Sequence, residues 1–183
     1  GWAPELDADP LSRAISAAFA TPLGPLADGA ALASVGAADR LPELDFELPM
    51  GSPTGAARTL ADVAALLRQH LPAADPLAGY PDHLGAPGLG PATLVGYLSG
   101  SIDAVLRLPA TAGNPARFLV VDYKTNFLGG ELDHYAPQAL AAAVREGDYD
   151  LQYLIYLVAL HRQLRHRLGH AYDPERHLGG ALY

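Results

Sequence analysis

The order of hydrophobic and polar residues along the chain predicts a mixture of helices and strands. Near the N-terminus, Leu11, Ile15 and Phe19 recur at helical spacing, and Asp9 is a favourable N-cap for a helix that begins there. Polar and apolar residues then alternate over residues 43–48, which is the period of a half-buried strand. The segment between these two elements is rich in Gly and Ala and is expected to be a loop.

Thr59 and Asp62 form the pattern of a capping box, which predicts a short second helix. The inward-facing side chains of this helix would be Val63, Leu66 and Leu67. Pro and Gly then recur so often over residues 72–91 that we expect a long loop within the domain.

The second half of the chain predicts a β-hairpin followed by two helices. Two strand-like runs, residues 94–108 and 117–125, are joined by a stretch of turn-forming residues. The later elements are helices at 137–146 and 148–168 and the opening of a strand at 180–183.

The composition is typical of one folded domain. Half of the 183 residues are hydrophobic and 17% are charged, so the chain carries enough apolar material for a core. The absence of cysteine excludes disulfides, thiolate metal sites and a cysteine nucleophile. No apolar run is long enough to span a bilayer, and we expect a cytoplasmic protein without membrane association. The net charge of −8 is unlike that of a free-standing nucleic-acid-binding protein, which usually carries a basic surplus.

Three charged residues interrupt the apolar pattern of the predicted hairpin. Asp103 lies in its first strand, and Asp122 and Lys124 lie in its second. A turn centred between Ala112 and Gly113 would place Asp103 opposite Asp122, about 5 Å apart at Cβ. Lys124 would project from the same face as Asp122, because side chains alternate along a strand. The sequence therefore predicts two carboxylates and one ammonium group in a small patch.

Two adjacent carboxylates repel each other unless a cation lies between them. Oxygen ligands of this kind suit Mg²⁺ or Mn²⁺, and a lysine nearby can orient or deprotonate water or stabilise negative charge. The implied reaction is metal-assisted hydrolysis of a phosphodiester. An Asp-x-Lys pattern on a strand is also common among solvent-facing charges, and a bulge in the hairpin would shift the pairing.

Gln152 and Tyr156 lie four residues apart on the long helix and so share one face. They could hold a nucleic-acid backbone or a metal-bound water, or they could form a polar pair at the edge of the core. No glycine-rich phosphate-binding motif is present, so no nucleotide cofactor is expected.

Three runs of sequence resemble the RecB-type nuclease domain of the PD-(D/E)xK superfamily. They are residues 96–103 (GYLSGSID), 122–126 (DYKTN) and 149–156 (YDLQYLIY), and their order and spacing make the set specific. The C-terminal nuclease domains of exodeoxyribonuclease V beta subunits are the most similar members. Residues 43–49 and 179–183 fit the same pattern, so the resemblance covers most of the chain.

The resemblance implies a restriction-endonuclease-like α/β core, in which helices flank a central mixed sheet, and Mg²⁺-dependent exonucleolytic cleavage of DNA. Asp103 and Asp122 match the family's metal-binding carboxylates, and Lys124 matches its catalytic lysine. The backbone carbonyl of Tyr123 matches a further metal ligand of the family. The family's helix motif near the site is matched by Gln152 and Tyr156.

The resemblance also implies partners, namely DNA, helicase domains and other subunits of an exodeoxyribonuclease V-like complex, and a recombinase, all acting in repair of double-strand breaks in the bacterial cytoplasm. The family carries another metal-ligating histidine in an upstream helix, and no histidine here matches it. We therefore expect one nuclease domain over residues 1–183 that is a fragment, lacking that helix and the last strands. The alternative is a non-catalytic module that keeps the nuclease fold and docks a helicase or a recombinase.

Overall fold

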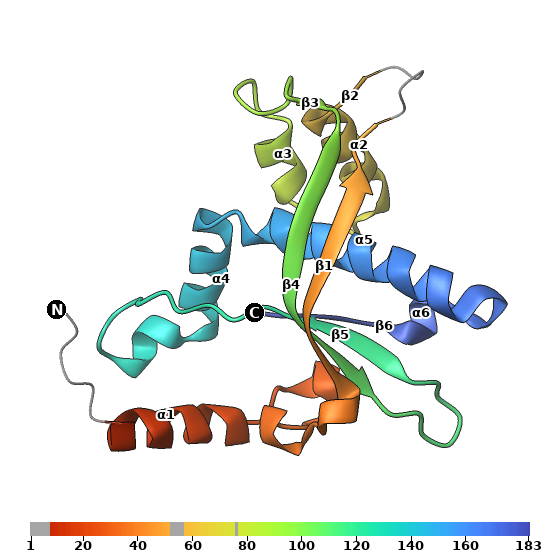
Figure 1. The fold of residues 1–183 in the computed structure, drawn as a ribbon. Coiled ribbons are helices and arrows are strands. Elements are labelled where there is room, and N and C mark those ends of the chain that lie inside the picture. The colour runs from red at the N-terminus through yellow and green to blue at the C-terminus, as the bar shows by residue number, and fades with distance from the viewer. Residues whose placement is uncertain (1–7, 52–56, 76) are drawn as a thin grey trace, which may run out of the picture. The chain divides into compact units, whose positions relative to one another are not determined.

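The computed structural model describes residues 8–51, 57–75 and 77–183. Its main sheet has four strands in the order β1 (Arg40–Pro49), β4 (Tyr97–Leu108), β5 (Arg117–Val121) and β6 (Leu178–Leu182). β4 and β5 are antiparallel, whereas β5 and β6 are parallel, so the sheet is mixed. The short strands β2 (Arg58–Thr59) and β3 (Thr93–Leu94) form a separate antiparallel pair (Figure 1).

Helices make up much of the remaining described chain. The α-helices are α1 (Ala8–Ala20), α2 (Leu60–His70), α3 (Tyr80–Leu84), α4 (Pro137–Glu146), α5 (Tyr149–Leu168) and α6 (Pro174–His177). The short 3₁₀ helices are η1 (Pro25–Ala27), η2 (Leu32–Ser34), η3 (Ala37–Asp39), η4 (Leu132–Tyr135) and η5 (Gly169–Ala171). A mixed sheet combined with helices confirms the predicted α/β fold class. No helix in the described ranges is long and apolar enough to cross a membrane.

The chain divides into two compact units, and each is assembled from separate segments of the sequence. Unit 1 contains the residues up to Leu44 together with 101–125 and 156–183, and unit 2 contains 45–100 and 126–155. β1, β4 and α5 each contribute residues to both units. The single domain expected over the whole chain stays a prediction.

The core of unit 1 forms where β4 and β5 pair. Leu106 and Leu119 lie opposite each other in the ladder, and both are fully buried. Ala27 and Leu32, from η1 and η2, pack into the same cluster. The segment between α1 and β1, expected to be a loop, therefore consists of 3₁₀ turns that cover one face of this strand pair.

The core of unit 2 forms where α2 and α3 pack around Ala64, Tyr80 and Leu84. The predicted capping box is present at the start of α2. The hydroxyl of Thr59 accepts a hydrogen bond from the Asp62 N–H (3.3 Å), and the Asp62 carboxylate accepts one from the Thr59 N–H (2.7 Å). This reciprocal pair satisfies two donors that a helix N-terminus otherwise leaves without partners.

Two predictions in this unit are wrong for physical reasons. Leu66 is 57% exposed, because α2 turns the small side chain of Ala64 to the core instead. Residues 72–91 are not a loop throughout, since α3 interrupts them and buries Tyr80 and Leu84. The frequent Pro and Gly residues predict a loop here, so the sequence pattern did not indicate this buried helical turn.

The ends of two other elements also differ from the prediction. α1 begins at Ala8, so Asp9 lies inside its first turn, where a negative charge suits the helix dipole, and is not the N-cap. Three side chains of its predicted apolar face are 40–47% exposed: Leu11, Ile15 and Phe19. The strand-like run at 94–108 divides into β3 and β4, because Gly96 between them adopts a positive φ of 79°.

Leu106→Ala should lower the free energy of unfolding by about 2–5 kcal/mol, because the change removes fully buried methyl groups and leaves a cavity. Leu66→Ala removes the same atoms from an exposed position and should change that free energy by less than about 0.5 kcal/mol. Urea unfolding of the two variants measures both changes. Equal destabilisation by the two substitutions would contradict the assignment of Leu66 to the surface.

Asp150 in unit 2 should make the stability of the protein depend on pH. Burial raises the pKa of its carboxyl above the ordinary value of 3.8, although the positive charge of Arg145 opposes the increase. The folded state then binds the proton more tightly than the unfolded state, so the free energy of unfolding falls as the pH rises from below 3.8 through the raised pKa. Urea unfolding curves at a series of pH values measure this decrease in the free energy of unfolding. Asp150→Asn should remove the contribution of Asp150 to the decrease, whereas Asp45→Asn, at an exposed position of β1, should retain it.

Candidate active site

The β4–β5 hairpin holds the candidate site, and its register is the predicted one. The ladder pairs Ala104 with Val121 at one end and Leu108 with Arg117 at the other, without interruption. Beyond it, the backbone groups of Thr111 and Asn114 exchange hydrogen bonds of 3.0 and 3.1 Å around a two-residue turn. Gly113 in this turn has a φ of 93°, a conformation that glycine adopts without strain. A turn at this position aligns the strands as the sequence predicts, and the irregularity in β5 affects its pairing with β6 instead.

Asp103 and Asp122 lie at the end of this ladder. The Asp103 Oδ2 atom accepts a hydrogen bond of 2.8 Å from the N–H of Tyr123, the peptide group next to Asp122. Asp122 is the residue immediately after β5, and its N–H donates a 3.1 Å hydrogen bond to the carbonyl of Leu182 in β6. β5 therefore holds Asp122 between two neighbouring strands, with Asp103 reaching across from β4.

Asp122 is a buried acid, with only 6% of its surface exposed. Its Oδ2 atom forms an ion pair with the Nζ atom of Lys124. A buried carboxylate of this kind is costly unless a positive charge lies close to it. Lys124 supplies that charge from two residues along the chain, as the alternation of side chains predicts.

A further contact to Lys124 comes from the last strand. The Nζ atom lies 5.1 Å from the centre of the Tyr183 ring, within the range of a cation–π interaction. Sequence reasoning missed Tyr183, because residues 180–183 indicated only the start of a strand. The parallel pairing of β6 with β5 carries the aromatic ring to the lysine, and the only signal available was the resemblance over residues 179–183.

Gln152 and Tyr156 both lie on α5, as predicted. Tyr156 belongs to unit 1, the unit that contains Asp103, Asp122 and Lys124, and its side chain is buried. Gln152 belongs to unit 2 and is partly buried. The structure thus groups the hairpin residues with Tyr123 and Tyr183, and it places the two helix residues in different units.

The oxygen atoms that the hairpin offers are of the kind that hard divalent cations prefer. Carboxylate oxygens from Asp103 and Asp122 and the carbonyl of Tyr123 are the ligands that Mg²⁺ and Mn²⁺ prefer. The Asp122 Oδ2 atom is buried beside the Lys124 ammonium group and accepts no well-formed hydrogen bond. Among the described residues, however, no group of three or more His, Cys, Asp or Glu side chains is placed to hold a metal. The site as described therefore offers two acidic ligands and no third.

Comparison with known proteins identifies relatives over the whole chain, although no family model matches it. The RecBCD enzyme subunit RecB of Mycobacterium tuberculosis is 48% identical over 190 residues, which cover 100% of this chain and 17% of that protein. The corresponding subunit of Mycolicibacterium smegmatis is 47% identical over the same shares. The Escherichia coli subunit is 37% identical over 173 residues, which cover 94% of this chain and 13% of that protein.

The chain thus spans about a sixth of the length of the mycobacterial relatives. The similar segment includes the hairpin, the long helix and the last strand, which carry the motifs recognised in the sequence. Over its whole length the chain is similar to one segment of the RecB subunit, and this confirms the RecB-type resemblance that its motifs predict.

Proposed function

We propose that the chain is a metal-dependent DNA nuclease domain that works within a helicase–nuclease complex of the RecBCD type. The observation that carries this proposal is the convergence of Asp103, Asp122 and Lys124 at one end of the β4–β5 ladder. Two carboxylates and an ammonium group in this arrangement are suited to hydrolysis of a phosphodiester. The similarity to RecB subunits supports the assignment to a RecBCD-type complex.

In this proposal, Asp103, Asp122 and the carbonyl of Tyr123 hold Mg²⁺, and Mn²⁺ could replace it. The bound cation would polarise the phosphate and lower the pKa of a water molecule. Asp103 is positioned for this task by its hydrogen bond from the Tyr123 N–H, which fixes one of its oxygens and leaves the other available. Asp122 brings the buried oxygen that accepts no hydrogen bond.

Lys124 would act on the attacking water or on the negative charge that develops at the phosphate. Its Nζ atom can hold the water by a hydrogen bond or stabilise the charge as a cation. The Asp122 carboxylate and the ring of Tyr183 both hold this ammonium group in place. Lys124 is therefore the proposed catalytic residue, and Tyr183 positions it.

DNA is the proposed substrate, and the proposed action is exonucleolytic, in repair of double-strand breaks by recombination in the bacterial cytoplasm. The net charge of −8 supports a division of labour, in which helicase domains and other subunits grip the DNA and deliver it to this domain. Gln152 and Tyr156 are proposed to lie near the strand being cut. A recombinase is a further proposed partner.

A second candidate is a module that keeps the nuclease fold without catalysis and docks a helicase or a recombinase. The observation that favours it is the absence, within the described residues, of a third acidic or histidine ligand beside Asp103 and Asp122. Calorimetric titration with Mg²⁺ and Mn²⁺ separates the two candidates. The nuclease requires saturable binding that depends on both aspartates, and the module requires none.

Asp122→Ala should abolish Mg²⁺-dependent DNA cleavage by the assembled complex, because it removes the carboxylate between Asp103 and Lys124. Helicase activity, measured as ATP-dependent strand separation, should persist. Asp122→Asn keeps the shape of the side chain and serves as a second variant if the alanine form folds poorly, while Asp45→Ala, on exposed β1, is the matched control. Full cleavage by both Asp122 variants would refute the assigned site.

Lys124→Gln should reduce the rate of cleavage by about 10²-fold or more, because the reaction loses its cationic or proton-transferring group. Binding of Mg²⁺ should not weaken, since the three oxygen ligands remain. Single-turnover cleavage measures the first quantity and calorimetry the second. A variant that loses metal binding together with activity would show that Lys124 maintains the site and does not assist the reaction.

A further inference from the structure

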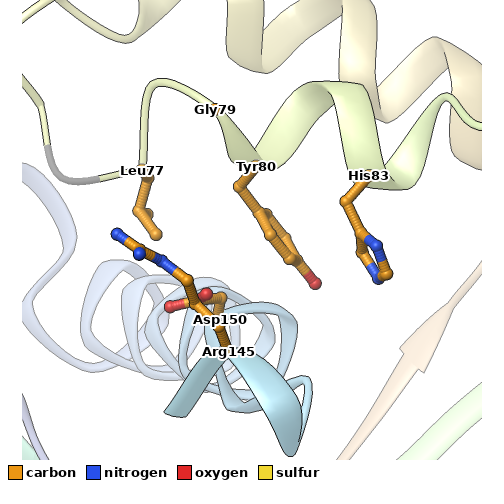
Figure 2. Close-up of a pocket in the computed structure, with 6 residues that line it drawn as sticks. All are labelled: Leu77, Gly79, Tyr80, His83, Arg145 and Asp150. Atoms are coloured by element: carbon orange, nitrogen blue, oxygen red, sulfur yellow. The ribbon is translucent and has the colours of Figure 1, made fainter. Parts of the chain in front are cut away.

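Unit 2 contains a cavity that the proposed nuclease site does not use. It lies between α3 and the start of α5, and its volume is about 410 Å³. The residues that line it are Leu77, Gly79, Tyr80, His83, Arg145 and Asp150 (Figure 2). This volume is in the range of pockets that bind small molecules.

Two buried polar side chains in this cavity lack the hydrogen bonds that they require. Asp150 is 4% exposed and Tyr80 is 8% exposed, and the Asp150 Oδ2 atom has no hydrogen-bond partner. The Tyr80 hydroxyl lies near the backbone of Leu151 but makes no well-formed hydrogen bond. Figure 2 shows the Tyr80 ring extending from α3 into the cavity and the Asp150 carboxylate on the side that carries Arg145 and Leu77. Buried polar atoms are nearly always satisfied, and two that line one cavity indicate a polar occupant.

The aromatic wall of the cavity is rigid. The rings of Tyr80 and His83 are stacked, with centroids 5.7 Å apart and planes at 28°. The Nε2 atom of His83 lies 3.0 Å from the Oδ1 atom of Asp148, which fixes the imidazole. The hydroxyphenyl and imidazole groups therefore both line the cavity from α3.

The charges around the cavity exclude two simple classes of ligand. Asp150 would repel an anion, even though Arg145 at the end of α4 partly offsets its charge. A metal ion is also disfavoured, because no group of three suitable ligands exists among the described residues. The ligand should be planar and uncharged where it meets Asp150, and it should present N–H donors to a carboxylate.

We propose that this cavity binds the base of a nucleotide, with guanine preferred. Guanine offers adjacent ring and amino N–H groups to the Asp150 carboxylate, whereas thymine offers one ring N–H and no amino group. The Tyr80 hydroxyl can donate to a ring or carbonyl acceptor of the same base, and pockets that read extruded bases combine such bonds with aromatic and apolar walls. Arg145 is a cation on the cavity lining that can meet the phosphate of the nucleotide.

This inference rests on the proposed function in one respect, because a nucleotide is both the unit of the substrate and the product of a DNA nuclease. The base could belong to a free nucleotide or to a single strand that reaches the cavity. Both sources present the same hydrogen-bonding edge, so the first measurement uses the free nucleotides and the second uses short strands.

The test is calorimetric titration of the 183-residue chain with dGMP, dCMP, dAMP and dTMP in the presence of EDTA. We expect dGMP to bind about tenfold more tightly than dTMP, a ratio typical of one buried hydrogen bond. Asp150→Asn should remove the preference, and Tyr80→Phe should weaken dGMP binding about tenfold while it preserves the ring. Asp45→Asn and Tyr97→Phe, at exposed positions outside the cavity, are the matched controls.

Unfolding curves of the same variants keep the test decisive. Tyr80→Phe removes a buried hydroxyl that makes no well-formed hydrogen bond, so the thermal midpoint should change little, and weaker binding then reflects lost contact and not misfolding. Binding of oligo-dG but not of free dGMP assigns the cavity to a strand. Equal binding of all four nucleotides, or none at millimolar concentration, overturns the proposal and leaves ordered water as the occupant.

Titration in EDTA tests the base pocket independently of the proposed nuclease site. Nucleotide binding in the absence of metal does not require Asp103 or Asp122, so Asp122→Ala should leave the preference for dGMP unchanged. No preference for dGMP in the unaltered chain, together with cleavage by the assembled complex that Asp122→Ala abolishes, would reject the base pocket alone.

Discussion

The buried ion pair between Asp122 and Lys124 is the interaction on which the candidate site depends. A carboxylate that is 6% exposed requires a nearby positive charge, and the strand places Lys124 on the same face two residues later. The position of β5 between β4 and β6 brings in the other parts, since Asp103 comes from one neighbour and Tyr183 follows the other. The chemistry of the site is therefore set by the order of three strands.

Burial of acids has different consequences in the two units. In unit 1, Asp122 has a lysine in contact, and its remaining capacity to bind a cation is what the proposed reaction uses. In unit 2, the Asp150 Oδ2 atom has no hydrogen bond, and burial raises the pKa of the carboxyl despite the positive charge of Arg145. The same residue type is thus paired with a contacting cation at one site and dominated by the cost of burial at the other.

The predictions that succeeded rest on local chemistry. The turn at Ala112 and Gly113 fixes the register of the hairpin, and the alternation of side chains then carries Asp122 and Lys124 to one face. α4 and α5 were predicted to within one residue, because Gly147 follows the last turn of α4 and charges of the expected sign flank α5. These features are encoded within a few residues of the elements that they define.

The predictions that failed depend on contacts between segments distant in the sequence. The helical period of α2 permits either Leu66 or Ala64 to face inward, and only the approach of α3 selects the smaller side chain. Tyr183 gains its place beside Lys124 through a parallel strand pairing, which no local pattern predicts. Gln152 and Tyr156 lie on one helix as predicted, and their place near the site stays a prediction.

The two-residue turn of the hairpin also restricts how this region can change in length. Thr111 and Asn114 close the turn with a pair of hydrogen bonds, so a single residue inserted between them must either bulge outward or move β5 by one position. A shift by one position would exchange the two faces of β5 and carry both charged side chains away from Asp103. The number of residues between the two aspartates can therefore vary among related chains only by changes that keep the register of β4 and β5, so the length of this loop is a constraint on the reaction centre.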